Sequence, residues 1–150
     1  MKILVIGGGG REHALCWSLK YTSPTPIELH CAPGNAGIAE IAQCYPQVKA
    51  DDVNGLLVLA EKIDPDSTVV GPEAPLVKRI VDLFSAAGFK IVGPTAAAAR
   101  LEGSKIFAKQ FMQKRGIPTA SAWIFHDAEA AIKFIMEKTT RKRFVPWTNS

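Results

Sequence analysis

The sequence predicts an α/β fold with an open parallel sheet, and three observations lead to that prediction. Through residues 1–101, short apolar runs alternate with segments of helical periodicity, which is typical of a parallel sheet with helices on both faces. The predicted strands end at glycine or proline residues. The first of them, residues 3–6, stops at four consecutive glycines, and a helical segment begins directly afterwards.

The glycine-rich turn at residues 7–10 predicts a site for an anion. Glycine reaches positive φ and lets a bound group approach the backbone closely, and the first N–H groups of the following helix favour an anion such as phosphate. Ligands of open α/β sheets bind at the carboxyl ends of the strands. A nicotinamide dinucleotide is disfavoured, because Glu12 or His13 stands where the G-x-G-x-x-G fingerprint has its third glycine, and no acidic residue ends the next strand.

The other elements follow in order from periodicity and turn residues. The first helix is expected at residues 11–21, where a proline-containing loop ends it. A second strand at 27–31 leads into a tight loop at 32–37, which Gly34 and Asn35 favour. The remaining elements of this part are expected at 53–63 (helix), 68–70 (strand), 75–84 (helix), 90–92 (strand) and after Thr95 (an alanine-rich helix).

The pattern changes after Leu101 and predicts the opening of a second domain. A helix at 105–115 has Ser104 as its cap, and a helix at 128–137 follows Asp127. Between them, residues 123–125 have the composition of a strand. The expected divisions of the chain are therefore 1–101, 102–137 and a basic tail, 138–150.

Composition sets the class of protein. A chain of 150 residues that is 47% hydrophobic can bury a real core, and its length fits one domain or one domain plus the start of another. No apolar stretch reaches the ~20 residues of a membrane span, and the first glycine comes too early for a secretory signal. The cysteines Cys16, Cys31 and Cys44 form no CxxC pair, so we expect free thiols in a reducing cytoplasm.

The net charge of +4 belongs to the tail. Four cations, Lys138, Arg141, Lys142 and Arg143, lie in a stretch without acidic residues, which leaves residues 1–137 formally neutral. The basic balance therefore does not describe a nucleic-acid-binding face, and no nucleic-acid partner is expected.

Four stretches of the sequence occur together in an order that identifies a family. They are GGGGREHAL (residues 7–15), APGNAG (32–37), VVGPEAPLV (69–77) and VGPTAAAARLEGSKIFAKQFMQKRGIPTA (92–120). With these motifs the chain, as far as about residue 135, resembles the N-terminal portion of glycinamide ribonucleotide synthetase, which is also called phosphoribosylamine–glycine ligase.

The resemblance implies a Rossmann-like substrate-binding domain at 1–101, of the kind that precedes an ATP-grasp domain, and the truncated start of that ATP-grasp domain at 102–137. It implies a cytoplasmic enzyme of de novo purine synthesis that joins glycine to 5-phosphoribosylamine, giving glycinamide ribonucleotide, ADP and phosphate. ATP and Mg²⁺ are the implied cofactors. The implied partners are the two small-molecule substrates, without nucleic acid or membrane.

The resemblance also implies the site residues. The substrate-binding set is Gly8, Gly9, Gly10, Arg11, Gly34, Asn35, Gly71, Pro72 and Glu73. Lys105 is placed at the edge of the ATP site, and no catalytic residue or metal ligand is assigned. Alternatives stay open: Arg11 as a surface cation, Glu73 as an acid favoured at a helix N-terminus, and Glu12 with His13 as residues that only fix the first helical turn.

The last residues depart from the family. Its members continue with a strand that carries an ATP-binding lysine, a glycine-rich loop and, far downstream, acidic Mg²⁺ ligands, whereas residues 138–150 match none of these and no glycine follows Gly116. We therefore expect an incomplete fragment of the ligase, with a non-catalytic phosphate-sugar-binding module or an inactive remnant as alternatives. A shifted reading frame is one hypothesis for the departure, and reading the coding DNA past codon 137 in all three frames tests it.

Overall fold

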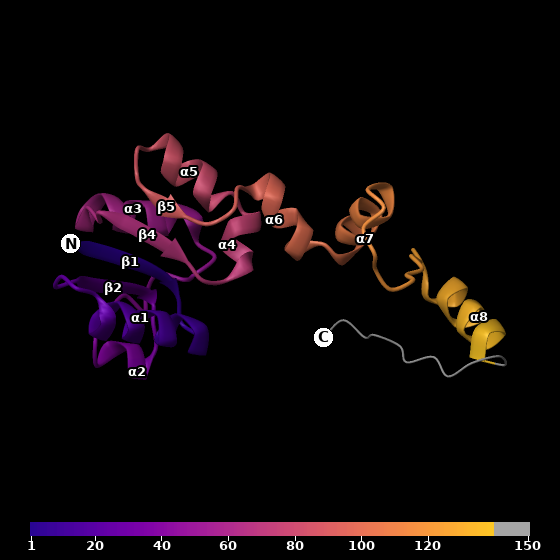
Figure 1. Ribbon diagram of the computed structural model, residues 1–150, viewed down its shortest axis with the longest axis horizontal. Coiled ribbons are helices and arrows are strands. Elements are labelled where there is room, and N and C mark those ends of the chain that lie inside the picture. Colours follow the sequence, from indigo (N-terminus) through magenta and orange to yellow (C-terminus); the bar gives the residue numbers. More distant parts are fainter. Residues whose placement is uncertain (140–150) are drawn as a thin grey trace. The chain divides into compact units, whose positions relative to one another are not determined.

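The computed structural model describes residues 1–139 and divides the chain into two compact units, Met1–Ala108 and Lys109–Ser150. The first unit confirms the predicted class, since it is an α/β domain with a five-stranded, all-parallel open sheet (Figure 1). The strands are β1 (Lys2–Gly7), β2 (Glu28–Pro33), β3 (Gln43–Cys44), β4 (Ser67–Val70) and β5 (Ile91–Val92). The helices are α1 (Gly10–Thr22), α2 (Ala36–Ala39), α3 (Val53–Ile63), α4 (Glu73–Val77), α5 (Ile80–Ala86), α6 (Ala96–Gly103), α7 (Lys105–Lys114) and, in the second unit, α8 (Ala128–Thr139).

Strand β1 lies at the centre of the sheet, whose order is β3-β2-β1-β4-β5. Its last residue, Gly7, is in register with Pro33 of β2, and Ile6 is in register with Val70 of β4. Because all three strands run in the same direction, the segments that follow them leave the sheet at one edge. This register is what positions the candidate site.

Two apolar cores cover the two faces of the sheet. Figure 1 shows α1 and α2 on one face and α3 and α5 on the other. The alternation of side chains in β1 feeds both cores. One core contains Ile3, Val5, Cys16, Ile27, Leu29, Cys31 and Ile38. The other contains Leu4, Ile6, Ala32, Leu56, Leu59, Ala60, Ile63, Leu76, Ile80, Val81, Phe84 and Ala99.

The structure corrects the helix predicted at 75–84, which is in fact two helices, α4 and α5. Arg79 between them has a left-handed backbone, with φ of 69°, and this turns the chain. Asp82 of α5 then accepts a hydrogen bond from the N–H of Ala96, 3.1 Å away, and so caps α6 from a neighbouring helix. Apolar periodicity runs on through both helices, so it does not mark the break.

The loop predicted at 32–37 contains a short helix that the sequence pattern does not indicate. Asn35 caps α2, because its side-chain oxygen accepts from the N–H of Ile38 at 2.9 Å. The edge strand β3 has only two residues and is too short to show a period.

The strand predicted at 123–125 is wrong. These residues have no strand partner within residues 1–139, and an isolated strand cannot satisfy its backbone groups. The rings of Trp123 and Phe125 pack instead against Phe134 of α8, with centroids 5.0 and 5.2 Å apart. None of the side chains described at 109–138 is buried. The prediction for the basic tail lies outside the described residues from 140 onwards.

None of the helices in the described part of the chain is long and apolar enough to span a membrane.

We expect Phe84→Ala to destabilise the first unit strongly. Phe84 is fully buried and packs against Phe89, with ring centroids 5.9 Å apart, and emptying such a site costs about 3–5 kcal/mol of unfolding free energy. The exposed Val58→Ala on α3 is the matched control, expected to change stability by about 0.5 kcal/mol or less. Urea denaturation followed by far-UV circular dichroism measures both, and equal losses would contradict the assignment of this core.

Candidate functional site

The segments that follow β1 and β2 are joined by hydrogen bonds at the carboxyl edge of the sheet. The N–H of Gly34 donates to the carbonyl of Gly7 at 3.0 Å, and the Asn35 side-chain amide donates to the carbonyl of Gly8 at 2.9 Å. A Cβ on Gly8 would lie 2.5 Å from the Gly34 carbonyl oxygen, so only glycine permits this approach. The structure thus brings together two of the three predicted substrate loops.

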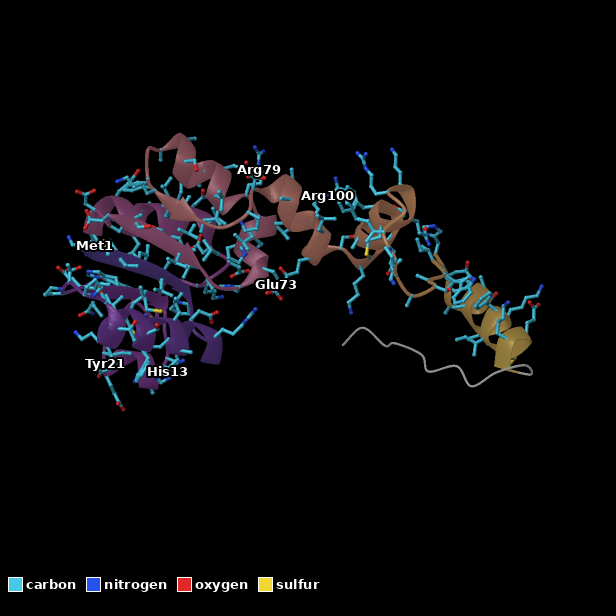
Figure 2. The ribbon with its side chains drawn as sticks, viewed as in Figure 1. Met1, His13, Tyr21, Glu73, Arg79 and Arg100 are labelled. Atoms are coloured by element: carbon cyan, nitrogen blue, oxygen red, sulfur yellow. The ribbon has the colours of Figure 1, made fainter. Side chains whose placement is uncertain are left out.

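The segment after β4 completes the edge. Gly71 donates its N–H to the carbonyl of Ile6 at 3.0 Å, Pro72 precedes α4, and Glu73 is the first residue of that helix. In Figure 2, Glu73 lies at the opposite end of the sheet from Met1, where the strands end. The three predicted loops are therefore neighbours in space.

Arg11 and Glu73 link the first and third loops across the edge. The guanidinium nitrogen Nη2 lies 3.5 Å from Oε2 of Glu73, and the side chains are 73% and 52% exposed. The pKa of the Glu73 carboxyl is lowered, first by a hydrogen bond from its own backbone N–H and then by Arg11. The edge therefore presents a cation and a charged carboxylate side by side, and both are accessible.

The glycine turn offers fewer N–H donors than the sequence suggests. The N–H of Gly9 donates to Oε2 of Glu12 at 2.7 Å and is already used. Gly10 and Arg11, in the first turn of α1, carry N–H groups that have no acceptor within a helix. An anion at this edge therefore meets donors from Gly10 and Arg11 and the positive end of the helix dipole. The sequence does not predict that Glu12 binds the Gly9 N–H. The one signal at this position is that Glu12 stands where the dinucleotide fingerprint has its third glycine.

Two further residues singled out by the sequence lie elsewhere. His13 is half-buried and packs against α2, where a Cβ on Gly37 would come 2.5 Å from its Cε1 atom. That contact gives His13 a part in packing α1 against α2, and the interpretation that it fixes the first helical turn stays a prediction. Lys105 is the first residue of α7 and is exposed. Its placement at an ATP site stays a prediction.

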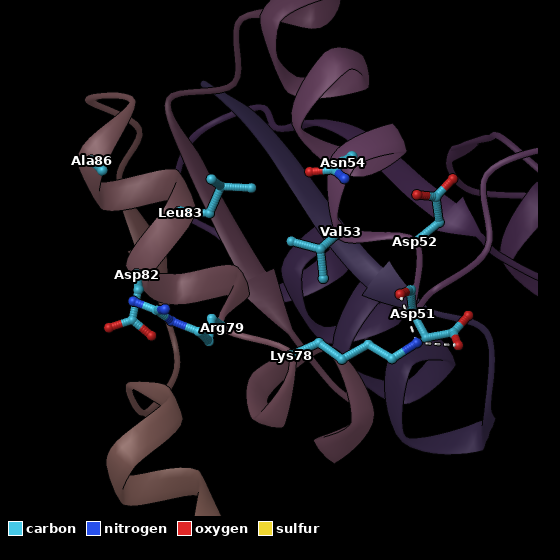
Figure 3. A pocket seen from close by; sticks show the side chains of 9 residues that line it. All are labelled: Asp51, Asp52, Val53, Asn54, Lys78, Arg79, Asp82, Leu83 and Ala86. Carbon is cyan, nitrogen blue, oxygen red and sulfur yellow. Dashed lines mark hydrogen bonds and ion pairs between the residues drawn. The ribbon is translucent and has the colours of Figure 1, made fainter.

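A hollow of about 590 Å³ lies between the N-terminal end of α3 and helix α5 (Figure 3). Its polar groups already serve the fold. Lys78 pairs with Asp51 at 2.8 Å, Asp52 caps α3 through the N–H of Gly55, and Asp82 caps α6. None of the predicted site residues lines it, so we place the candidate site at the sheet edge.

Within residues 1–139, no group of three or more His, Cys, Asp or Glu side chains is placed to hold a metal ion. The described residues therefore do not fit a Mg²⁺ site, and we derive no step through the metal.

The fold defines the class of protein. Its shape is shared by the biotin carboxylase domain of Hydrogenobacter thermophilus 2-oxoglutarate carboxylase, with a TM-score of 0.67 and 21% identity over 91% of this chain and 32% of that chain. It is also shared by N5-carboxyaminoimidazole ribonucleotide synthetase from Thermotoga maritima, with a TM-score of 0.64 and 20% identity over 89% of this chain and 36% of that chain. At these identities the likeness concerns the fold alone, an α/β domain with an open parallel sheet.

Residues 1–102 match the family described as phosphoribosylglycinamide synthetase, N domain, and the chain belongs to that family. It is 52% identical over 141 residues to the phosphoribosylamine–glycine ligase of Xanthomonas axonopodis pv. citri (strain 306), covering 93% of this chain and 32% of that relative. The enzyme of the same name from Escherichia coli (strain K12) is 51% identical over 139 residues, covering 92% and 32%. The chain thus spans about a third of the length of the curated relatives that it matches.

We expect Arg11→Ala to raise the pKa of the Glu73 carboxyl part of the way to its ordinary value, since the backbone hydrogen bond remains. A lowered carboxyl pKa stabilises the fold above the ordinary pKa, and this contribution is lost as the pH falls through the folded-state pKa. Carbon-13 NMR titration of the glutamate carboxyls measures the change. Lys20→Ala, in the last turn of the same helix, is the control. An unchanged Glu73 pKa in Arg11→Ala would contradict the ion pair.

Proposed function

We propose that the first unit binds 5-phosphoribosylamine at the carboxyl edge of its sheet, as the N-terminal part of a phosphoribosylamine–glycine ligase. The observation that carries the proposal is the meeting of three loops at a glycine-rich helix N-terminus, with Arg11 and Glu73 on one side. The 52% identity to ligases of that name supports the choice of substrate.

The chemistry of the edge suits the two ends of this substrate. The 5-phosphate is placed at the N-terminus of α1, where Gly10 and Arg11 supply main-chain donors and the Arg11 guanidinium supplies charge. Gly8 and Gly34 have no side chains to obstruct the approach. Glu73 is an acceptor for a ribose hydroxyl or for the amine. We assign Gly9, Asn35 and Gly71 to the walls, because their polar groups already form hydrogen bonds within the protein, and Pro72 with them, because it lies between Gly71 and α4.

In the reaction that we propose for the whole ligase, ATP phosphorylates the carboxylate of glycine, and the amine of phosphoribosylamine attacks the acyl phosphate. The C–N bond forms as the C–O bond to phosphate breaks, which yields glycinamide ribonucleotide, ADP and phosphate. ATP supplies the phosphoryl group, and Mg²⁺ held by parts of the ligase outside the described residues would neutralise the charge of the triphosphate. The residues of this edge hold the amine substrate, and Lys105 is proposed to lie beside ATP. The three cysteines are free thiols, which fits a cytoplasmic setting.

A binding module without catalysis is the second candidate. It is favoured by the second unit, in which none of the side chains described at 109–138 is buried. Release of ADP that requires ATP, Mg²⁺, glycine and phosphoribosylamine together separates the two candidates. Turnover by a full-length ligase that carries this chain as its N-terminal part, without turnover by the chain alone, would support the first candidate. Binding of the sugar phosphate without turnover in either form would support the module. A fluorescence increase on adding NADH would instead revive a dinucleotide site.

We expect ribose 5-phosphate to shift the amide NMR signals of Gly8, Gly10, Arg11 and Gly34 in the 150-residue chain. Arg11→Ala should weaken binding about tenfold, the scale of one charge-assisted hydrogen bond. The control is Lys20→Ala, which removes the same charge from the far end of α1 and should leave the dissociation constant unchanged. Spectra that do not change on addition of ribose 5-phosphate would reject the proposed site.

A further inference from the structure

Glu12 is buried to a degree that helix capping does not require. It is the third residue of α1, and its carboxylate accepts from the N–H of Gly9, as a glutamate at this position commonly does. A side chain with only that role remains at the helix surface in contact with water. The whole Glu12 residue, however, is only 5% exposed.

Two glycines from different loops make room for this carboxylate. A Cβ on Gly7, which has φ of 130°, would lie 2.6 Å from Cγ of Glu12. A Cβ on Gly71 would lie 2.5 Å from Cγ and 2.6 Å from the carboxyl carbon, and would overlap Oε1. The Glu12 side chain therefore lies between the turn after β1 and the segment after β4, in direct contact with both.

One carboxylate oxygen meets no donor there. Oε1 of Glu12 is buried and has no hydrogen-bond partner among the described residues. An acceptor buried without a partner is unfavourable, because it has lost its hydrogen bonds to water and gained none in exchange. If Glu12 only capped the helix, its carboxylate could lie at the surface, where water would bind Oε1. The burial of the carboxylate therefore indicates a second role for the side chain.

We propose that Glu12 is a positioning residue that clamps the segment after β4 against the glycine turn. The clamp sets the spacing between the donors of the α1 N-terminus and Glu73, so that both face one ligand. The effect on ligand binding rests on the proposed function, whereas the clamp itself is a property of the fold.

The positioning role and the charge of Glu12 have opposite effects on the affinity for ribose 5-phosphate, so the direction of the change in a variant distinguishes them. A carboxylate close to a phosphate site repels the phosphate, so removing the charge of Glu12 should by itself strengthen binding. Loss of the clamp should weaken binding. We expect the clamp to dominate, with Glu12→Ala raising the dissociation constant of ribose 5-phosphate about tenfold. Glu12→Gln keeps the acceptor for Gly9 and the volume beside Gly71 but removes the charge, and should bind ribose 5-phosphate at least as tightly as the wild type.

A double-mutant cycle tests the clamp without any ligand. Gly71→Ala introduces a methyl group into the volume of the carboxylate and should lower the urea midpoint. Adding Glu12→Ala removes the obstruction, so the double variant should lose less stability than the sum of the two single variants. Gly10→Ala is the matched glycine control for stability, because a Cβ there meets no atom within 4 Å. Additive losses would overturn the clamp.

The Gly9 amide supplies a readout that is independent of stability. In the wild type its proton signal should lie downfield, because the Glu12 carboxylate accepts a hydrogen bond from it, and Glu12→Ala should move the signal upfield. If the cycle shows coupling and the wild type does not bind ribose 5-phosphate, the proposed function fails and the clamp stands. If the wild type binds and Glu12→Ala binds equally well or more tightly, the positioning role is overturned.

Discussion

The parallel register of β1 with β2 and β4 is the constraint on which the rest of the site depends. Gly7 stands opposite Pro33, and Ile6 stands opposite Val70, so the segments after β2 and β4 leave the sheet one strand spacing to either side of the segment after β1. Each segment is then tied to its neighbour by a main-chain or side-chain hydrogen bond. A shift of register in one pair would separate the loops and would also exchange the two faces of a strand between the two cores.

The loops come so close because glycine occupies the points of contact. Gly8 lies against the carbonyl of Gly34, and Gly71 lies against the carboxylate of Glu12. The same absence of side chains that lets the loops approach one another also leaves main-chain donors open to a ligand. Packing and binding therefore require the same residue type, and a sequence motif such as GGGGREHAL reports both at once.

The sequence predicts those features of the fold and the site that depend on neighbouring residues, and it misses those that depend on contacts between distant parts of the chain. Strand β1, helix α3 and the loop residues at the sheet edge carry local patterns, and the sequence predicts them. The break at Arg79 does not interrupt the apolar periodicity, and strand β3 has too few residues to show an alternation. Residues 123–125 have the composition of a strand, but they have no strand to pair with among the described residues. The burial of Glu12 depends on Gly71, which reaches it only through the pairing of β1 with β4. The fingerprint identified Glu12 as unusual but gave no indication of its surroundings.

The ion pair between Arg11 and Glu73 bears on the kind of ligand that we propose for this edge. Both groups are largely exposed and 3.5 Å apart, and such surface pairs contribute little to stability. Separating them is therefore easy. A ligand with an anionic group at one end and hydrogen-bond donors at the other can bind Arg11 through the anion and Glu73 through the donors. A simple anion would bind only Arg11 and would leave Glu73 without a partner beside it. For the site that we propose, the pair therefore favours a molecule with both features, and the proposed substrate, an aminated sugar phosphate, has both.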